Sequence, residues 1–492
     1  MTDSSGTRSI YDFRPVLLVI GVLLATLGCA MMLPAMYDLA MGHDDWQIFA
    51  ASSLITLFVG TSLAFANRGR TENLTIRQAF LMTNLAWIAL TAFGALPFAW
   101  SSEKVGYTDA FFETMSGITT TGATVLQGLD ALPPGLLLWR GILQWLGGLG
   151  IIVMAVALLP ILQIGGMQMF RVEAFDTAGK VLPRATQIAG SLTAFYVAAT
   201  ATCAIAYALA GMSTFDAIVH SMTTIATGGY SNHDASFAYF DSAMIEIVCI
   251  VFMCVGSLPF VLYLKAISTG DIRCLTADSQ VRWFFGAITL FTTIAVISYE
   301  ANIPEPGGSK TLDALFNVVS ILTGTGYATT AYDLWSPLAM VLFFLMMFVG
   351  GCTGSTSCGL KIFRFQVMFE TIRCRVRHVI YPKGVFVERY NGKPIPDTVI
   401  NAVMGLFLLF MTVFAVSATL LSIVGLDSLT AISAAATAVS NVGPGLGPVV
   451  GPAGNFSTLP DSAKWILSAT MLLGRLEIFT VLVLFTPAFW RA

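Results

Sequence analysis

Charged residues are scarce in this sequence. Asp, Glu, Lys and Arg make up 11% of its 492 residues and hydrophobic residues 56%, and the mean hydropathy is +0.78. Soluble proteins carry about 25% charged residues, so this chain has too few polar side chains to cover a water-facing surface. Its 25 basic and 28 acidic residues give a net charge of −3, which provides no positive field for nucleic acid. These shortages exclude a soluble protein and predict one integrated in the lipid bilayer.

The residue types that build catalytic and metal sites are also few. The chain has 4 His and 8 Cys, with no Cys-x-x-Cys pair and no Cys/His spacing suited to zinc. Cys29, Cys203, Cys249 and Cys254 lie in apolar stretches, where we expect small buried hydrophobic side chains. The sequence contains no nucleophile with its base, no Walker A motif and no dinucleotide-binding unit. We therefore expect neither an enzyme nor a cofactor bound by this chain.

Long apolar runs, in contrast, are abundant. A membrane-crossing helix needs about 20 apolar residues. Ten stretches meet this criterion, the eighth with an interruption: 15–37, 46–66, 76–99, 135–163, 185–210, 241–267, 281–300, 336–370, 398–424 and 461–489. The first run is longer than the apolar core of a signal peptide, about 7–15 residues, so we expect it to be retained as a span. The sequence predicts an all-α polytopic membrane protein.

Four shorter, mildly apolar segments lie between the spans, around 108–121, 214–227, 311–325 and 427–442. They contain TDAFFETMSG, TFDAIVHSMT, TLDALFNVVS and LDSLTAISAA, and each closes with a turn of small residues. The turn glycines, about one hundred residues apart, are Gly122, Gly228, Gly326 and Gly443. An Asp at the beginning of each segment is expected to cap a short helix and complement its dipole. The chain is thus predicted to repeat one unit four times.

The basic residues fall on one side of the predicted membrane. Twenty of the 25 Lys and Arg residues lie in the N-terminus and in alternate connections, and such an excess marks the cytoplasmic side. The opposite connections, such as 38–45 and 230–241, carry Asp and His but almost no Lys or Arg. The N-terminus is therefore predicted to be cytoplasmic, and all four short segments enter from the outer side.

Four helix-and-turn segments that enter from one side predict a pore. Irregular backbone at membrane depth is tolerated only where it is buried in protein or lines a water-filled path. Rings of backbone carbonyls can replace the water shell of a dehydrated cation, and K⁺ suits such a site better than Na⁺. Glycine permits the backbone conformations that turn successive carbonyls toward one axis. A secondary carrier with broken helices is the alternative, but it is expected to have two repeats and a midplane site, whereas this chain has four.

The four glycine turns, the period of helix, pore loop and helix, and the interrupted helix with GGCTGSTSCG resemble the TrkH/TrkG/KtrB superfamily of potassium transporters. The resemblance covers essentially the whole chain, and two additional N-terminal helices resemble the Trk branch. It implies potassium uptake across the bacterial inner membrane by a homodimer, with one pore in each chain. The implied units are a two-helix N-terminal unit, 1–72, and pore repeats 73–180, 181–275, 276–394 and 395–492.

The resemblance also implies which residues hold K⁺ as the transported ion. They are Thr120, Thr121 and Gly122; Ala226, Thr227 and Gly228; Gly324, Thr325 and Gly326; and Asn441, Val442 and Gly443. Related plant transporters with Ser instead of the first filter glycine favour Na⁺, so Gly122 favours K⁺, and a Na⁺-permeable member of the same fold is the alternative. The fourth turn, SNVGPGLGP, lacks Thr before its glycine, so the choice between Gly443 and Gly445 stays open.

Two further features predict a gate. The run 350–359 places so many glycine and hydroxyl residues inside an apolar span that a helix would break there, although a helix-packing surface of small residues is an alternative. Arg475 lies near the middle of the last predicted span, where a charge must face a wet cavity or a partner such as Glu477. The resemblance implies an intramembrane loop below the filter with Arg475 beside it. The candidate gate residues are Gly350, Gly351, Gly354, Ser355, Gly359, Lys361 and Arg475.

The largest cytoplasmic connection, from Lys361 to Lys393, carries eight basic residues. Contact with anionic lipid headgroups is one use of such a stretch. The resemblance to the Trk branch implies another, the docking of a cytosolic nucleotide-binding regulatory subunit of the TrkA (RCK) type. Any response to a nucleotide would then belong to that partner, because this chain has no nucleotide motif.

Overall fold

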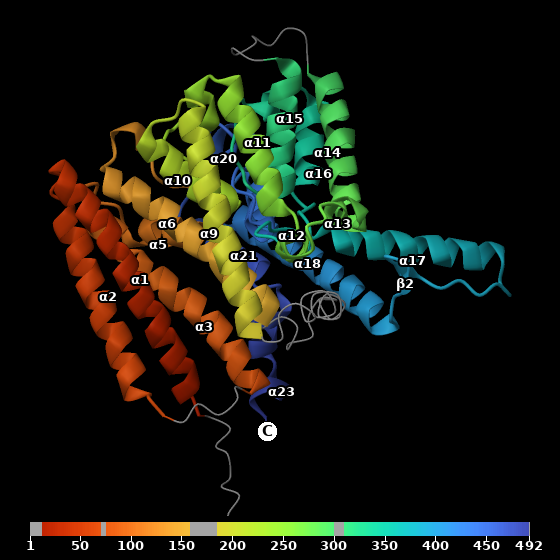
Figure 1. Ribbon diagram of the computed structural model, residues 1–492, viewed down its shortest axis with the longest axis horizontal. Helices are drawn as coiled ribbons and strands as arrows, with labels where there is room; N and C mark the ends of the chain where they lie inside the picture. Colours follow the sequence, from red (N-terminus) through yellow and green to blue (C-terminus); the bar gives the residue numbers. More distant parts are fainter. Residues whose placement is uncertain (1–11, 70–74, 158–184, 300–308, 492) are drawn as a thin grey trace, which may run out of the picture.

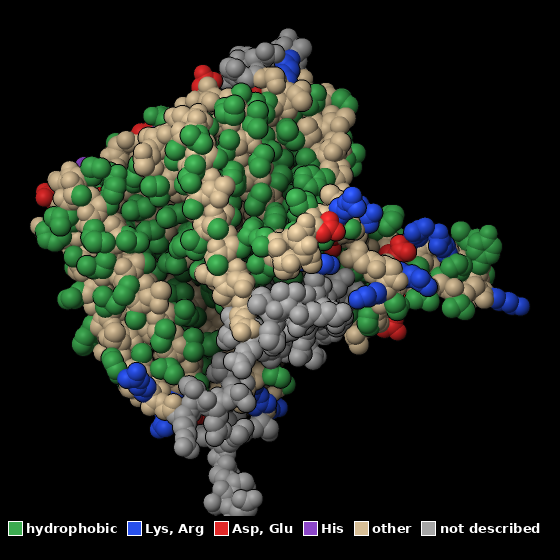
Figure 2. Space-filling view, in the orientation of Figure 1, with side chains coloured by type: hydrophobic (Ala, Val, Ile, Leu, Met, Phe, Trp, Pro, Cys, Tyr) green, Lys and Arg blue, Asp and Glu red, His purple; other side chains and the backbone are tan. Residues whose placement is uncertain are grey.

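The computed structural model describes residues 12–69, 75–157, 185–299 and 309–491. These residues are almost entirely helical, and the described strands, β1 (Arg389–Tyr390) and β2 (Lys393–Pro394), form one short antiparallel hairpin (Figure 1). The predicted all-α fold is confirmed. The interior consists of packed apolar side chains, whereas the broad flank in Figure 2 is covered mainly by exposed hydrophobic residues, as a lipid-facing surface requires.

The helices follow the order of the predicted units. The first part contains α1 (Arg14–Met41), α2 (Trp46–Ala66), α3 (Ile76–Gly94), α4 (Leu96–Trp100), α5 (Tyr107–Ile118) and α6 (Pro134–Ala157). The middle contains α9 (Ala185–Leu209), α10 (Thr214–Ile225), α11 (Ala243–Ser257), α12 (Phe260–Thr269), α13 (Arg273–Ala277), α14 (Ser279–Ser298), α15 (Lys310–Thr323) and α16 (Pro337–Met346). The last part contains α17 (Ile362–Ile380), α18 (Asp397–Ile423), α19 (Ser428–Ser440), α20 (Gly447–Val450), α21 (Asp461–Arg475), α22 (Phe479–Leu482) and α23 (Pro487–Trp490).

Within the described residues, seven helices are long and apolar enough to cross a membrane, or up to nine if two bent pairs each count as one span. The eighth predicted span, 336–370, has the interruption that the sequence predicts, since α16 ends at Met346 and α17 begins at Ile362. The spans predicted at 241–267 and 461–489 are also broken, with bends of 92° between α11 and α12 and of 107° after α21. The prediction of unbroken helices there was wrong.

Each break has a local cause. Pro259 follows α11 and cannot continue its hydrogen-bond pattern, because proline has no backbone N–H. The last carbonyls of α11, at Gly256 and Ser257, instead accept hydrogen bonds from the backbone N–H groups of Thr356 and Cys352, at 3.2 and 3.0 Å. After α21 the chain turns at Glu477 and Ile478, which both have positive φ. Sequence hydropathy gives no sign of either bend.

Four short helices, α5, α10, α15 and α19, correspond to the predicted segments and are 12 to 14 residues long. Only Asp427 caps its helix, by accepting a hydrogen bond from the backbone N–H of Thr430 at 3.0 Å. The capping positions of the other three are Gly106, Ser213 and Ser309. The prediction that Asp caps all four was therefore wrong for Asp109, Asp216 and Asp313, which lie in the first helical turn and complement the dipole from there.

One helix leaves the body of the molecule. Helix α17 projects sideways in Figure 1 and carries Arg373, Arg375 and Arg377, which contribute to the basic groups on that arm in Figure 2. Its exposed apolar residues include Phe369, Ile372 and Val376. Some basic residues used for the predicted orientation lie outside the described residues: Arg8, Arg70, Arg171, Lys180 and Arg184. The predicted unit boundaries at 72 and 180 also lie there.

Candidate functional site

Each short helix is followed by a turn with the same backbone conformation. The first residue of the turn has a positive φ in every case: +53° at Thr120, +50° at Thr227, +70° at Gly324 and +53° at Asn441. Two residues later a glycine does so again: +86° at Gly122, +79° at Gly229, +86° at Gly326 and +111° at Gly443. Positive φ at a residue other than glycine is strained and persists only where the surrounding structure imposes it. Three turns carry such a residue at the same point, so the repeat extends to backbone geometry.

The four turns form a closed ring. A Cβ atom on each of these glycines would collide with a carbonyl oxygen of the next turn along the chain, and the fourth turn faces the first. The pairs, glycine first, are Gly122 with Gly228, Gly229 with Thr325, Gly326 with Val442, and Gly443 with Thr121. Only glycine allows backbone to approach backbone so closely. A ring of carbonyl dipoles from four turns can hold a dehydrated cation.

The second turn differs by one residue from the stretch expected from the sequence. Its conformation matches the other turns at Thr227, Gly228 and Gly229, whereas Ala226 still has a right-handed backbone with φ −71° and ψ −10°. The reason is that two consecutive glycines, Gly228 and Gly229, follow Thr227. When the Thr-Gly pair of this turn is aligned with that of the first turn, Gly228 takes the place of Gly122. In the fourth turn the matching glycine is Gly443, and Gly445 does not have a positive φ.

Side chains close the ring where the first and last turns meet. The Asn441 amide nitrogen donates hydrogen bonds to Thr121 Oγ1 at 2.8 Å and to the Met471 carbonyl oxygen at 2.9 Å. Gln144, on α6, donates to the carbonyl oxygen of Gly228 at 2.6 Å and accepts from the backbone N–H of Tyr230 at 3.1 Å. The sequence reasoning did not single out Gln144, because an isolated glutamine in an apolar span is a weak signal.

A buried ion pair lies behind the first and second turns. Arg140 is 2% exposed and Glu113 0%, and Arg140 Nε donates to Glu113 Oε1 at 2.9 Å. Arg140 was also missed from the sequence, although it interrupts the apolar run LLLWRGILQW much as Arg475 interrupts the last one. The same argument, that a charge within a span must face a partner or a wet cavity, would have found it.

The interrupted segment between α16 and α17 is an irregular loop held by hydrogen bonds to neighbouring elements. Thr356 Oγ1 donates to the carbonyl oxygens of Ile225 at 3.0 Å and Gly256 at 2.8 Å. The backbone N–H of Thr353 donates to Gln280 Oε1 on α14 at 2.9 Å. Because Ile225 is the last residue of α10, these contacts place the loop directly beside the end of a pore-loop helix.

The loop also contacts the turns. Cys358 Sγ lies 3.6 Å from Thr120 Oγ1. A Cβ atom on Gly324 would lie 3.5 Å from the backbone nitrogen of Cys358. The loop therefore lies against the first and third turns of the ring. The candidate gate residues that belong to this loop are Gly350, Gly351, Gly354, Ser355 and Gly359. An irregular path excludes the alternative of a continuous helix-packing surface.

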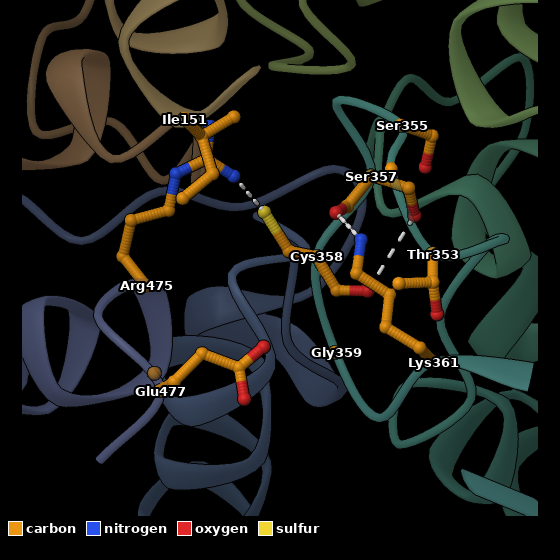
Figure 3. Close-up of a pocket in the computed structure, with 11 residues that line it drawn as sticks. Ile151, Thr353, Ser355, Ser357, Cys358, Gly359, Lys361, Arg475 and Glu477 are labelled. Atoms are coloured by element: carbon orange, nitrogen blue, oxygen red, sulfur yellow. Dashed lines mark hydrogen bonds between the residues drawn. The ribbon is translucent and has the colours of Figure 1, made fainter. Parts of the chain in front are cut away.

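Arg475 reaches the same loop from α21. Its guanidinium donates to Cys358 Sγ, to the Thr356 carbonyl oxygen at 3.3 Å and to the Gly147 carbonyl oxygen at 3.4 Å. Figure 3 shows the guanidinium pointing toward Cys358, and the Lys361 ammonium group toward the Ser357 carbonyl oxygen. The sequence predicts Arg475 near the middle of a straight span. In the structure it is instead the last residue of α21, where the chain bends.

Glu477 does not pair with Arg475. Its carboxylate instead accepts a hydrogen bond from Arg364 on α17. Residues two apart do not share a helix face, and here the chain bends between them. The alternative of a structural pair between Arg475 and Glu477 is therefore wrong, and the charge of Arg475 faces the loop and a cavity.

Two cavities flank the ring. The outer one, named for the side that the sequence predicts to face outward, has an empty volume of about 730 Å³ and is lined by Gly122, Gly229, Gly443, Tyr230 and His233 among others. The inner one, about 460 Å³, is lined by Arg475, Lys361 and loop residues that include Ser357 and Cys358. Ring residues thus line one space and the loop and Arg475 line another, an arrangement suited to the passage of a small ion.

Acidic groups and a histidine lie at the rim of the outer cavity. His233 Nδ1 is 2.5 Å from Asp130 Oδ1, and His233 Nε2 is 3.4 Å from Asp216 Oδ1. Burial acts to lower the pKa of His233, but the interactions with Asp216 and Asp130 outweigh it and raise the pKa above its usual value. Asp216 responds in the opposite direction. Burial acts to raise its pKa, but hydrogen bonds from His233, Asn232 and Ser213 lower it overall.

A family model for TrkH, described as "Cation transport protein", matches residues 46–492 of this chain. The chain belongs to the TrkH family. It is 44% identical over 486 residues to the Trk system potassium uptake protein TrkI of Halomonas elongata, which covers 99% of this chain and 98% of that protein. It is 39% identical over 483 residues to the Trk system potassium uptake protein TrkH of Salmonella typhimurium, covering 97% and 99%.

The same fold is found in a solved TrkH structure. The crystal structure of the potassium transporter TrkH from Vibrio parahaemolyticus matches this chain with a TM-score of 0.90 and 38% sequence identity, covering 98% of this chain and 100% of that one. The resemblance noted from the glycine turns and the interrupted helix is therefore confirmed at the level of the family.

Proposed function

We propose that this protein takes up potassium across the bacterial inner membrane through the ring of four turns. The observation that carries the proposal is the closed cycle in which a glycine of each turn faces a carbonyl oxygen of the next. Backbone carbonyls at close quarters replace the hydration shell of K⁺. The family relatives that are named potassium uptake proteins support the same ion.

The proposed filter follows the backbone register rather than the Thr-Gly pattern. We assign it to Thr120, Thr121 and Gly122; Thr227, Gly228 and Gly229; Gly324, Thr325 and Gly326; and Asn441, Val442 and Gly443. Ala226 leaves the proposed set and Gly229 enters it. The ion is cargo in this proposal and no cofactor is required.

The loop 350–359 and Arg475 form the proposed gate. A fixed positive charge in a water-lined path raises the barrier for cations, and Arg475 lies at the inner cavity with Lys361 nearby. Movement of the loop away from the ring, or of Arg475 away from the loop, would open the path. The contacts of Thr356 with Ile225 and Gly256 hold the closed arrangement.

Orientation and partners belong to the same proposal. The concentration of Lys and Arg in alternate connections supports a cytoplasmic N-terminus and a cytoplasmic location for the arm formed by α17. We propose that the protein is a homodimer in the bilayer and that its basic cytoplasmic surface, which includes Arg373, Arg375 and Arg377, receives a nucleotide-binding regulatory subunit of the TrkA type. The charge of that surface supports an acidic partner or lipid headgroups.

Uptake of ⁸⁶Rb⁺ into proteoliposomes tests the proposed function. The purified protein is assayed with excess external K⁺, Na⁺ or Li⁺, and we expect K⁺ to abolish Rb⁺ uptake while Na⁺ barely reduces it. Rb⁺-dependent thermal stabilisation of the detergent-solubilised protein provides a second readout if a closed gate prevents flux. Equal competition by Na⁺ and K⁺, or equal stabilisation by both, would favour the Na⁺-permeable alternative.

Gly122→Ser tests the filter itself. A Cβ atom at Gly122 would collide with the Gly228 carbonyl oxygen, so the first and second turns must separate and Na⁺ should compete at least about tenfold better, a change of about 1.4 kcal/mol in discrimination. Gly211→Ser is the matched control, because Gly211 also has a positive φ but has open space around its Cβ position. Unchanged competition in Gly122→Ser would reject the ring as the selective element.

A further inference from the structure

The ion pair of Arg140 and Glu113 connects the chain segments that leave the first two turns. Arg140, on α6, donates from Nη1 to the Ser231 carbonyl oxygen at 2.6 Å and from Nη2 to Thr124 Oγ1 at 3.2 Å. Its guanidinium carbon lies 4.1 Å from the ring centre of Tyr230. One side chain therefore contacts the segments after Gly122 and after Gly229.

Glu113 completes the connection from the other side. It lies on α5, and its Oε2 accepts a hydrogen bond from the backbone N–H of Val125 at 2.9 Å. Thr124 Oγ1 donates to both carboxylate oxygens at 3.0 Å. The Tyr230 hydroxyl donates to the Glu113 carbonyl oxygen at 2.7 Å. All six residues are thus joined in one network immediately behind the contact of Gly122 with Gly228.

The other three repeats do not use charge at the matching position. Nine residues before the ring glycine stand Glu113, His220, Asn317 and Ala434. His220 Nε2 lies 3.0 Å from Ser231 Oγ, and the Asn317 amide donates to Thr329 Oγ1 at 2.9 Å. Each holds the segment that leaves its own turn, whereas Ala434 has no polar group. Within the described pore-loop helices, Glu113 is the carboxylate at this position and Arg140 its counter-charge.

Stability alone does not account for such a pair. Two charges lose their hydration when they are buried, and apolar side chains of similar volume often stabilise a protein equally well. A charged network does provide fixed geometry, because charge-assisted hydrogen bonds are shorter and stronger than neutral ones. Here the network fixes the distance between the first and second turns, whose carbonyl groups face the ring.

We propose that Arg140 and Glu113 are positioning residues that determine K⁺ over Na⁺ selectivity by fixing the spacing of the first and second turns. The inference rests on the proposed function, since it concerns the selectivity of the proposed filter. A ring whose turns can move inward coordinates the smaller Na⁺ more closely. Holding the segments after Gly122 and Gly229 to α5 and α6 opposes that movement.

Competition by Na⁺ during ⁸⁶Rb⁺ uptake tests the proposal in three variants. Arg140→Lys keeps the charge but loses the planar fork that reaches three partners. Glu113→Gln keeps the shape but removes the charge, and the double variant Glu113→Gln/Arg140→Met removes both charges. We expect at least about a tenfold loss of discrimination against Na⁺ in all three, equivalent to about 1.4 kcal/mol. Recovery of selectivity in the neutral double variant would show that charge balance, not position, matters, and would overturn the proposal.

Lys464→Met is the matched control. Lys464 is 4% exposed, and its Nζ pairs with Asp109 Oδ1 at 2.5 Å. Asp109 lies on the same helix as Glu113, in the first turn of that helix. The loss of Lys464 breaks another ion pair of α5, in which Asp109 is 31% exposed, but removes no side chain of the network, and we expect wild-type selectivity. Wild-type selectivity in Arg140→Lys and Glu113→Gln as well would overturn the proposal.

Thr124→Val keeps the test decisive if the ionic variants do not fold. It removes the hydroxyl that contacts Glu113, Arg140 and the backbone N–H of Leu126. We expect at least about a threefold loss of discrimination, the effect of losing a single one of these hydrogen bonds. The readout is the ratio of Rb⁺ to Na⁺ concentrations that give equal thermal stabilisation, and an unchanged ratio would reject the proposal. A wild-type protein without K⁺ preference would instead defeat the proposed function, so the two failures are distinguishable.

Discussion

Arg475 is a buried guanidinium that uses neighbouring carbonyl oxygens in place of a carboxylate. It is 4% exposed, contacts the loop at Thr356 and Cys358, and its Nε atom has no hydrogen-bond partner among the residues that the structure describes. A cation that passes the inner cavity must approach this charge. At the residue scale, Arg475 therefore makes the strongest electrostatic contribution to the proposed gate.

Replacement of Arg475 by Ala is expected to increase flux. Removal of the charge and of the contacts with the loop lowers the barrier, and a fall of about 1.4 kcal/mol would raise the initial rate of ⁸⁶Rb⁺ uptake about tenfold. Selectivity against Na⁺ is expected to stay as in the wild type, because the ring glycines are untouched. Arg475→Lys, which retains the charge, is the control, and an unchanged rate in Arg475→Ala would contradict the assigned role.

Single residues differ in how well the sequence predicts them. Gly122 and Gly326 follow from a repeated pattern, whereas the sequence leaves the choice between Gly443 and Gly445 open. Gly228 and Gly229 cannot be told apart by residue type because both are glycine. The backbone φ decides between them, and φ depends on where α10 ends. Arg140 was detectable in principle, since a lone Arg in an apolar run requires a buried partner.

At the scale of elements, one hydroxyl joins the loop between α16 and α17 to two neighbouring helices. Thr356 donates to carbonyl oxygens at the ends of two helices, α10 and α11. The hydroxyl of Thr353, three residues earlier, is buried but has no hydrogen-bond partner within the described part of the chain. Two threonines in one loop thus provide a matched comparison.

Thr356→Val is expected to loosen the loop, and Thr353→Val is expected to leave it as it is. Loss of the Thr356 hydrogen bonds leaves two carbonyl oxygens without this donor, at a cost of about 1–3 kcal/mol. If the loop closes the path, Rb⁺ uptake in Thr356→Val rises several-fold, by about tenfold for each 1.4 kcal/mol that closure loses. Equal uptake rates in the two variants would show that the hydroxyl contacts do not hold the closed state.

The bends of the long helices explain why element boundaries were harder to predict than elements. Hydropathy finds apolar length, but apolar residues continue on both sides of Pro259, and α21 continues into an apolar run after its bend. The bend after Arg475 depends on Arg364, which is distant in sequence and pairs with Glu477. A tertiary contact of that kind leaves no periodic signal in a single chain.

Considered as a whole, the molecule links its outer segments through a pH-dependent contact. His233, between α10 and α11, bridges Asp130 after the first turn and Asp216 on α10. The raised pKa of His233 means that its contribution to stability is fully present below the unfolded value of about 6.5 and is lost as the pH rises through the higher folded value. The contact therefore stabilises the outer mouth most strongly in acid.

His233→Gln is expected to lower the melting temperature at pH 6 and to have little effect at pH 9. A partly exposed ion contact in a chain of this size is worth about 1–3 °C, measured by thermal unfolding of the detergent-solubilised protein. His43→Gln, in the loop between α1 and α2, serves as the control for the loss of a histidine. If His233→Gln lowers the melting temperature by the same amount at both pH values, the charged form of His233 is not the source of the stabilisation.

The closure of the ring has a consequence for biosynthesis. Thr121 belongs to the first turn and its neighbour Asn441 to the last, and 320 residues separate the two. While the ribosome is still producing the chain, three turns can be in the bilayer but the fourth side is missing. A partly made or truncated chain that stops before Gly443 therefore lacks a complete selective passage, and we expect a growing cell to be protected from leakage through its own unfinished transporters.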